Sequence, residues 1–491
     1  MLRTVRIEVH NDEPLFDYLD FLTKANTNLY NAGLFVSRQV LTGVEKAPAN
    51  RQPNEQNVLN MIQNALPQMD TENMQFKMPQ SGKGMLTYPF LYRLFHVTQN
   101  PDYFADGFPR KCAQQTLKQV AQDMHAFFAQ WKAYSANPVK GQGKPKLPGY
   151  KRKGKGSTVS LTNQTCHIEK TDDGTSLLEF PKWNKQRPVA QLGNCVNACW
   201  KFIKATVVPY QENVFRLNLV FEDGKALPEL REPSRICAID LGVDNFAAIT
   251  NNIGKPAMLI KGKCVKSVNV YYNKRMANLK SQQTRGKTNA KGGPLRFVPT
   301  DESRMLSRYR DHWMSDFMHK AGRLVVNWCL ANDIDTIVVG ANKLWKNKCH
   351  IGYMTQTFVQ IPYDSFKRIL AYLCEWNGIR YVEQEESYTS LSSFLNQDPI
   401  PVFGSQSENL PEFTGTRMGR LYENRDTNGE VKIVNADING SANIGRKAFP
   451  GLFTPNNCDI LSHPLIWKHP DMQPVTASKS KGTHTTAEPQ K

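Results

Sequence analysis

Alternating hydrophobic and polar residues open the chain and predict a β-strand. Val5, Ile7 and Val9 alternate with polar neighbours, which is the period-2 pattern of a strand with one buried face. Over residues 15–41 the apolar spacing becomes helical. Residues 47–80 are rich in Gln, Asn and Pro and show few periodic signals, so we expect loops and short helices there.

An amphipathic helix is predicted over residues 111–134. Its apolar positions recur at spacings of four and three, as one buried helical face requires: Ala113, Leu117, Val120, Met124, Phe127 and Trp131. Two strands follow at 202–208 and 215–221, and the turn at Gly224 ends a β-rich unit.

From residue 236 onward, predicted strands and helices alternate. We expect strands at 236–240, 257–270, 336–340 and 379–386, and helices at 303–331, at 363–376 and after Asp437. Such alternation is typical of an α/β unit with a central sheet. Periodicity is lost after Pro450, and the polar residues 476–491 are expected to be disordered.

The charge of the chain is strongly positive and unevenly distributed. Lys and Arg number 62 against 44 Asp and Glu, a formal net charge of +18. Residues 124–168 and 245–300 contain no acidic residue. Two such long bands favour a nucleic-acid partner, because each phosphate that Lys or Arg neutralises releases condensed counterions. A merely solvated basic surface is the weaker alternative.

The first band contains a segment, residues 144–156, that we call the basic loop. Its Pro and Gly residues exclude a continuous helix, so we expect an extended loop that contacts nucleic acid through Lys144, Lys146, Lys151, Arg152, Lys153 and Lys155.

The cysteine spacing and the hydropathy of the chain indicate the cellular compartment in which it is expected. The ten Cys residues follow no framework spacing, and no apolar run follows the basic start of the chain. No window approaches the roughly 20 apolar residues of a spanning helix. We therefore expect an intracellular protein with reduced thiols, without signal peptide or transmembrane segment. Cys195 and Cys199 lack partners for a zinc site, and we expect buried thiols there.

Three acidic positions are candidates for a metal site. Asp240 ends an apolar strand, a second apolar strand runs into Glu383–Glu386, and Asp437 begins a helix with small residues. Singly, these could be a turn former, exposed loop charge and an N-cap. Together on one α/β sheet they suit a two-metal phosphodiesterase, because hard oxygen ligands bind Mg²⁺ or Mn²⁺.

The order and wording of the motifs resemble the TnpB family of transposon-encoded proteins (OrfB-type transposases), which is related to the type V CRISPR effectors and to Fanzor. The resemblance covers most of the chain. Its carriers are Asn28–Ala32, Ala113–Leu117, Gly143–Pro148, Ile239–Val243, Tyr272–Arg275, His319–Lys320, Phe358–Pro362, Tyr388–Ser390 and the Asp437 segment.

The resemblance implies a multi-domain α+β architecture, in which a RuvC (ribonuclease H-like) α/β nuclease domain follows a wedge β-barrel with a helical recognition insert. The implied boundaries are residues 1–14 for the first part of the wedge, 15–137 for the helical recognition domain, 138–232 for the second part of the wedge with the basic loop, 233–450 for the nuclease domain, and 451–491 for a largely disordered tail.

The activity that the resemblance implies is RNA-guided DNA cleavage next to a short target-adjacent motif. Implied partners are a guide RNA transcribed from the protein's own element and double-stranded target DNA, with Mg²⁺ or Mn²⁺ as cofactor. The protein would be a monomer on its RNA, in a prokaryotic cytoplasm or nucleoid, and would not contact a membrane. Further nucleic-acid contacts are expected at Lys274, Arg275, His319 and Lys320.

The chain departs from the family in its middle carboxylate. Most members carry a Glu at the end of the strand after the long helix, where this chain has Gly340. Glu386 stands three residues before Thr389, and some relatives place the carboxylate there, so we expect Asp240, Glu386 and Asp437 to be catalytic and to bind the metal, with Glu385 as second choice. Strand alternation should put Glu385 and Glu386 on opposite faces.

A second departure concerns the zinc ribbon of the family. No Cys occurs between Cys374 and Cys458, and Ser393 and Asn396 stand roughly where the first cysteine pair would be. We expect a metal-free insertion over residues 391–432 and no zinc. Two rival functions stay open: a nuclease-dead, RNA-guided DNA-binding repressor, which the loss at Gly340 would favour, and a protein-only transposase.

Overall fold

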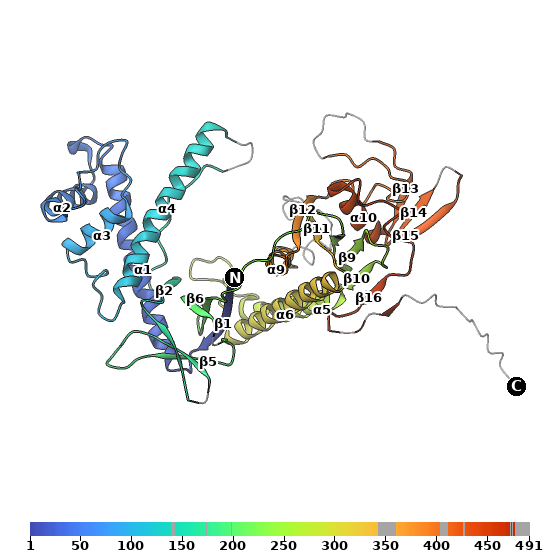
Figure 1. Ribbon diagram of the computed structural model, residues 1–491. Helices are drawn as coiled ribbons and strands as arrows, with labels where there is room; N and C mark the ends of the chain where they lie inside the picture. The colour runs from blue at the N-terminus through green and yellow to red at the C-terminus, as the bar shows by residue number, and fades with distance from the viewer. Residues whose placement is uncertain are drawn as a thin grey trace. The chain divides into compact units, whose positions relative to one another are not determined.

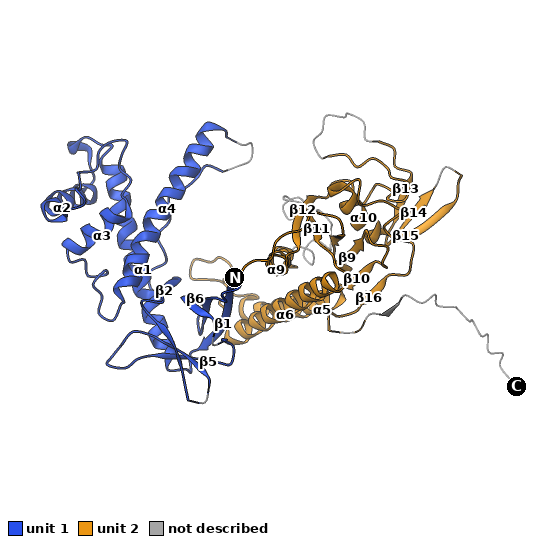
Figure 2. Cartoon of the chain, viewed as in Figure 1, with its two compact units in different colours: residues 1–225 blue, residues 226–491 orange. Residues whose placement is uncertain are grey.

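The chain forms two compact units, residues 1–225 and 226–491 (Figure 2). The structure is a computed structural model, and it describes residues 1–138, 143–172, 174–197, 199–341, 360–402, 411–425, 428–471, 473 and 475–476. No helix within these residues has the length and apolar character needed to cross a membrane.

The first unit contains two antiparallel sheets. One has the order β1-β7-β6-β2 and the other the order β3-β4-β5. The predicted opening strand pairs along its whole length with β7, for example Val5 with Leu219. The strands are β1 (Leu2–His10), β2 (Val159–Thr162), β3 (His167–Lys170), β4 (Ser176–Glu179), β5 (Val189–Gly193), β6 (Lys201–Gln211) and β7 (Val214–Glu222).

The helices of this unit all lie between β1 and β2 in the sequence. They are α1 (Leu15–Gly43), α2 (Pro53–Met69), α3 (Tyr88–Val97) and α4 (Arg110–Ala136), with the short 3-10 helix η1 (Pro48–Asn50). The Gln- and Asn-rich segment thus holds a 17-residue helix, α2, instead of only short ones. Its buried side includes Val58, Leu59 and Ile62, and its amides occupy the remaining positions, which weakened the periodic signal.

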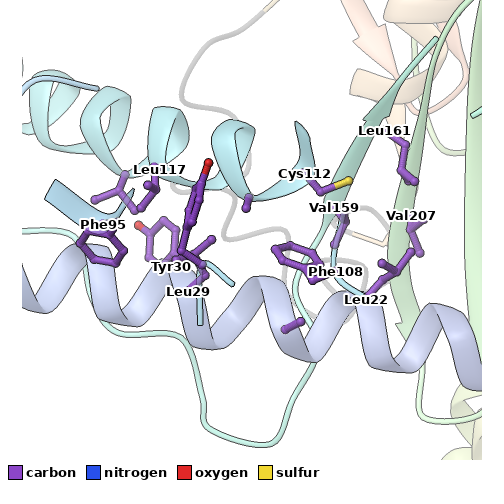
Figure 3. Packing of buried hydrophobic residues seen from close by; sticks show 14 of the residues in the cluster. Leu22, Leu29, Tyr30, Phe95, Phe108, Cys112, Leu117, Val159, Leu161 and Val207 are labelled. Atoms are coloured by element: carbon purple, nitrogen blue, oxygen red, sulfur yellow. The ribbon is translucent and has the colours of Figure 1, made fainter. Parts of the chain in front are cut away.

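One apolar core joins the helices and the sheet of the first unit (Figure 3). Leu29 of α1 and Leu117 of α4 are fully buried in it, as are Leu161 of β2 and Val207 of β6. Because the same cluster contains side chains of the helices and of the β-strands, the two parts of this unit are stabilised together.

The second unit is built on a seven-stranded mixed sheet of order β12-β11-β8-β9-β10-β16-β17. β8, β9 and β10 are successive antiparallel neighbours, whereas β11 is parallel to β8 and β12 is parallel to β11. The bounds are β8 (Ile236–Leu241), β9 (Asn245–Asn251), β10 (Met258–Lys261), β11 (Thr336–Ala341), β12 (Arg380–Glu385), β16 (Leu465–Trp467) and β17 (Val475–Thr476).

Helices cover both faces of this sheet (Figure 1). They are α5 (Lys263–Thr284), α6 (Asp301–Ala331), α9 (Tyr363–Trp376) and α10 (Ala436–Ala448). Side chains of α6 and α9 share one apolar cluster with Ile239 and Val339, and side chains of α10 share another with Ala238 and Val338. Since strand side chains alternate, residues 238 and 240 of β8 and residues 338 and 340 of β11 face α10.

Two predicted elements of this unit are wrong. Residues 263–270 belong to helix α5 and not to a strand. Their Val content favoured a strand, but the buried Val265 and Asn269 are four residues apart, which is helical spacing. The expected disordered tail also begins too early, because Phe453, Ile460 and Trp467 are buried and β16 pairs with β10. Residues 477–491 lie outside the described residues.

Candidate active site

Asp240 lies at the carboxyl end of β8, on the sheet face that α10 covers. Close packing brings the helix to it: a Cβ built on Gly440 of α10 would lie 3.0 Å from Asp240 Oδ2. Ser441 Oγ donates to the carbonyl of Ala238 over 2.8 Å, so the helix is fixed directly on this strand. The small residues predicted to allow tight packing therefore do so at the candidate carboxylate.

Glu386 occupies the space that opens over Gly340. A Cβ built on Gly340 would lie 2.5 Å from Glu386 Oε2 and 2.8 Å from Ile444 Cδ1 of α10. In β11, Val339 pairs with Ile239, which places Gly340 at the level of Asp240. A carboxylate from the residue that follows β12 thus lies where a side chain at position 340 would stand.

A turn after β12 sets the direction of Glu386. Thr389 donates from its backbone N–H and from its hydroxyl to the Glu386 carbonyl, at 3.2 and 2.8 Å. Tyr388 has a φ of +64°, a left-handed conformation that few residues other than Gly adopt. Asn443 of α10 is fully buried and its Nδ2 donates to the Thr389 carbonyl. The Tyr-Thr-Ser motif therefore serves to hold the backbone behind Glu386.

Glu385 takes part in other contacts. Lys447 Nζ of α10 donates to Glu385 Oε2 over 2.6 Å, and the backbone N–H of Ser387 donates to Glu385 Oε1. These hydrogen bonds hold the pKa of Glu385 below its ordinary value, despite the opposing effect of partial burial. The negative charge of the Glu385 carboxylate is therefore compensated by Lys447.

Asp437 stands in the first turn of α10 without capping it. The N-cap is Asn435, whose Oδ1 accepts from the backbone N–H groups of Asp437 and Ile438. The Asp437 carboxylate is therefore available for other contacts. Asn245 Nδ2 donates to its Oδ2 over 2.8 Å, and Arg417 Nη2 donates to its Oδ1 over 2.9 Å.

The negative charges of Glu386 and Asp437 act on the carboxyl group of Asp240. Burial and then the negative charges of Glu386 and Asp437 raise the pKa of Asp240 well above its ordinary value, although part of its surface remains open to solvent. Burial raises the pKa of Glu386 to about 7, with a further rise caused by Glu385. In the described part of the chain, no three His, Cys, Asp or Glu side chains are gathered closely enough to hold a metal ion.

The basic loop is docked on α1 and is not a free extended segment. The amide of Asn31 makes two hydrogen bonds to the backbone of Lys151, and Thr27 Oγ1 donates to the Lys155 carbonyl. Lys151 is half-buried with its Nζ 3.8 Å from the centre of the Tyr30 ring. The other five basic residues of the loop are exposed: Lys144, Lys146, Arg152, Lys153 and Lys155.

The basic loop borders a small polar cavity of about 80 Å³. Lys151 and the amides of Gln115 and Gln119 are among the residues that line it. The motif residues of α1 and α4 thus meet the basic loop in one place.

The four predicted basic positions of α5 and α6 are all at least partly exposed, but three of them have partners. Arg275 pairs with Glu302 at 2.6 Å, His319 Nδ1 lies 2.7 Å from the Ser315 carbonyl, and Lys320 pairs with Asp316 and Asp471. These ion pairs raise the pKa of Lys320 to about 12. The fourth position is Lys274, which is exposed on α5.

The predicted insertion forms a small antiparallel sheet of β13 (Gly415–Met418), β14 (Leu421–Arg425) and β15 (Val431–Asn435). Asp398 is only 4% exposed and accepts hydrogen bonds from the backbone of Ser393 and from the backbone and hydroxyl of Thr414. Ser393 Oγ in turn donates to Asn424 Oδ1 over 2.6 Å. A buried carboxylate and its hydrogen bonds thus connect the segments of the insertion; residues 403–410 and 426–427 lie outside the described residues.

One expectation about cysteines is wrong. Cys195 and Cys199 are exposed and not buried. They lie in the connection between β5 and β6.

Three residues near the carboxylates were not predicted: Asn245, Arg417 and Asn443. Asn443 carried a signal, because Asn439 and Asn443 are four residues apart on the apolar face of a predicted helix and both are fully buried. The contact of Arg417 with Asp437 joins residues 20 apart in sequence through the fold of the insertion, which no local pattern indicates.

Comparisons with known proteins agree with the resemblance to the TnpB family. Residues 211–346 match the OrfB_IS605 family, described as a probable transposase. This segment includes β8 with Asp240 and β11 with Gly340. The chain is therefore similar to this family over residues 211–346; no curated protein matches it.

Several solved structures are similar to the chain. A Cas12f1-sgRNA-target DNA complex has 11% identity and a TM-score of 0.45, and the match covers 90% of this chain and 98% of that one. CasPhi-2 (Cas12j) bound to crRNA and phosphorothioate-DNA has 7% identity, 92% coverage of both chains and a TM-score of 0.47. Alicyclobacillus acidoterrestris C2c1 with single-guide RNA has 9% identity, coverage of 87% and 70%, and a TM-score of 0.36.

Proposed function

We propose that this chain is an RNA-guided DNA endonuclease of a mobile element, which cleaves target DNA next to a short adjacent motif at a RuvC site. The observation that carries the proposal is the position of Asp240 and Glu386 on the α10 side of the central sheet, with Asp437 in the first turn of α10 and near enough to act on Asp240 electrostatically, within a TnpB-like chain. In the described residues the three carboxylates are not gathered closely enough to hold a metal ion as they stand, so metal binding requires them to approach one another. An α/β nuclease domain of the ribonuclease H type is supported by the mixed sheet with helices on both faces.

The three carboxylates are ligands of the type that divalent cations bind, although they must approach one another to share one ion. Asp240 and Glu386 carry raised pKa values, which means that nearby positive charge falls short of compensating them. A divalent cation would supply that charge, and carboxylate oxygens are the ligands that Mg²⁺ and Mn²⁺ prefer. We infer that Asp240, Glu386 and Asp437 hold the metal, and that Glu385 stays with Lys447. Held by these residues, divalent cations would supply the activation of a water molecule and the stabilisation of the departing oxygen of the phosphodiester.

The residues of the chain would prepare this site before any ligand arrives. Thr389 and Asn443 fix the backbone that carries Glu386, so its carboxylate is oriented in advance. Asn245 holds one oxygen of Asp437. Such preorganisation spares the reorganisation that a flexible site would need during the reaction.

Nucleic-acid binding is assigned to the first unit and to α5. We infer a wedge domain in the strands of residues 1–14 and 138–232, a helical recognition domain at 15–137, and a nuclease domain at 233–450. The exposed cations of the basic loop suit the phosphates of a guide RNA. Amides beside the loop, such as Gln115 and Gln119, can donate to and accept from base edges.

A protein-only transposase is the second candidate, because the matched family is described as a probable transposase. It would use the same carboxylates and would carry no discrete RNA. A nuclease-dead repressor would keep RNA and target binding without cleavage. We expect the active endonuclease to be a monomer on its RNA.

The experiment is to purify the full chain with nuclease inhibitors and sequence the RNA bound to it. We expect one discrete RNA from the protein's own element. The complex should then cut a plasmid with a guide-matched target in Mg²⁺, and Asp240→Ala should abolish cutting while target binding remains. Absence of a discrete RNA would favour the transposase, and binding without cutting by the unaltered chain would favour the repressor.

A further inference from the structure

A tight turn in the insertion brings two arginines to the acidic site. β13 and β14 are joined at Gly419 and Arg420, and Gly419 has a φ of +63°, as a two-residue hairpin turn requires. Arg417, just before the turn, binds Asp437, and Arg420, within the turn, binds Asp244 Oδ2 at 2.8 Å. The end of the hairpin is thus anchored on two carboxylates of the nuclease unit.

Arg417 is in direct contact with one candidate metal ligand, Asp437, whereas Lys261 reaches only Asn245 beside it, over 2.7 Å. Arg417 Nη2 lies 2.9 Å from Asp437 Oδ1, and the charge of Arg417 opposes the rise in the pKa of Asp240. Asn245 holds the other oxygen of Asp437. Both oxygens of this carboxylate therefore already accept a hydrogen bond within the protein.

We propose that Arg417 is a latch, which neutralises Asp437 in the chain without nucleic acid and is displaced when Asp437 Oδ1 binds a divalent cation. The inference rests on the proposed nuclease function and adds a control step to it. A guanidinium and a metal ion are both positively charged and repel each other when they contact one carboxylate oxygen, so the two cations compete for Asp437.

The ion pair between Arg417 and Asp437 is one that can break readily. The Arg417 side chain is 39% exposed, and ion pairs with this much solvent contact contribute little and exchange readily. A nucleic-acid phosphate that enters the site offers the guanidinium a bidentate partner of equal charge. Target loading would therefore draw Arg417 from Asp437 and make the carboxylate available, which couples metal uptake to the presence of substrate.

The hairpin keeps its place without this contact. Tyr422 OH donates to the Leu391 carbonyl over 2.6 Å, and the Ala436 N–H donates to the Arg420 carbonyl over 2.9 Å. The Asp398 hydrogen bonds are likewise independent of Arg417. Removal of the Arg417 side chain is therefore expected to open the latch and leave the fold intact.

The test measures Mn²⁺ affinity of the full-length protein freed of nucleic acid, by electron paramagnetic resonance of free Mn²⁺. Arg417→Ala should bind Mn²⁺ about fivefold more tightly than the unaltered chain, the factor expected from loss of one partly exposed competing ion pair. Arg425→Ala is the matched control, since Arg425 is on the same sheet and pairs with Glu423. It should change the affinity less than twofold.

A general charge effect is separated from the latch by a double-mutant cycle. In an Asp437→Asn background, Arg417→Ala should change Mn²⁺ affinity clearly less than in the chain with Asp437, because only the longer-range effect of its charge on Asp240 remains. Arg417→Gln, checked by thermal melting, provides a second variant. Equal affinity of Arg417→Ala, Arg417→Gln and the unaltered chain would overturn the latch alone, as would a gain of the same size with Asp437→Asn. No Mn²⁺ binding by any of these proteins would overturn the metal-dependent nuclease as well.

Discussion

Gly340 leaves the space in which the Glu386 carboxylate lies, so a single methyl group at this position tests the candidate site. In Gly340→Ala the new Cβ would stand 2.5 Å from Glu386 Oε2, where an ordinary contact needs at least 3.4 Å. The carboxylate would have to retreat by about 1 Å, because Ile444 blocks another side of the methyl group at 2.8 Å. A misplacement of about 1 Å at a reacting group costs on the order of 100-fold in rate.

The assay is single-turnover cleavage of a guide-matched duplex by the protein–RNA complex at saturating Mg²⁺. Gly322→Ala is the matched control, because its Cβ would meet Ile369 at 2.9 Å in the layer of α6 and α9, on the other face of the sheet. Both variants should lose about 1–3 kcal/mol of stability by overpacking. Only Gly340→Ala should lose the rate. Equal rates for the two folded variants would refute the placement of Glu386 as a metal ligand.

Three further predictions follow from the contacts described. Without divalent ions, Glu386→Gln should raise the free energy of unfolding at pH 8 by up to about 3 kcal/mol, measured by urea unfolding. The reason is the raised pKa of Glu386, about 7, because ionisation of this carboxyl destabilises the folded chain as the pH rises from about 4.5 to 7. The difference between the two proteins should therefore vanish near pH 4. Asp398→Asn should lower the free energy of unfolding by about 1–3 kcal/mol, because backbone donors lose a charged partner. The backbone N–H of Thr414 should then exchange with solvent faster, and unchanged exchange would contradict this role of Asp398. Lys153→Ala should reduce the salt dependence of RNA binding by close to one counterion, while Lys320→Ala, whose Lys already pairs with Asp316, should change it less; equal effects would contradict the assignment of the basic loop.

Local sequence patterns were sufficient to predict most strands of the central sheet. Alternation along β12 depends only on backbone geometry, so it could separate Glu385 from Glu386, whereas the choice of Glu386 came from the resemblance. The Glu385 carboxylate nevertheless reaches α10, where it contacts Lys447. The resemblance supplied the order of the motifs. The structure adds the physical link, which is the space over Gly340.

Long-range contacts were beyond such patterns. Asp437 could equally have been an N-cap, and only the geometry shows that Asn435 performs this task. The α5 segment was misassigned because β-branched residues were weighed above the spacing of its buried positions. Arg417 was missed because a surface hairpin with Arg is ordinary in sequence, and its partner is determined by how the insertion packs on α10.

The most direct test of the central claim compares two neighbouring glutamates in one assay. Guided cleavage of a matched duplex in Mg²⁺ should fall at least about 100-fold in Glu386→Gln. Glu385→Gln should cut within a few-fold of the unaltered chain, because the Glu385 carboxylate is held by Lys447 and by the backbone of Ser387. The account would be contradicted by normal cutting in Glu386→Gln together with loss in Glu385→Gln, or by a protein–RNA complex that binds its target and never cuts it.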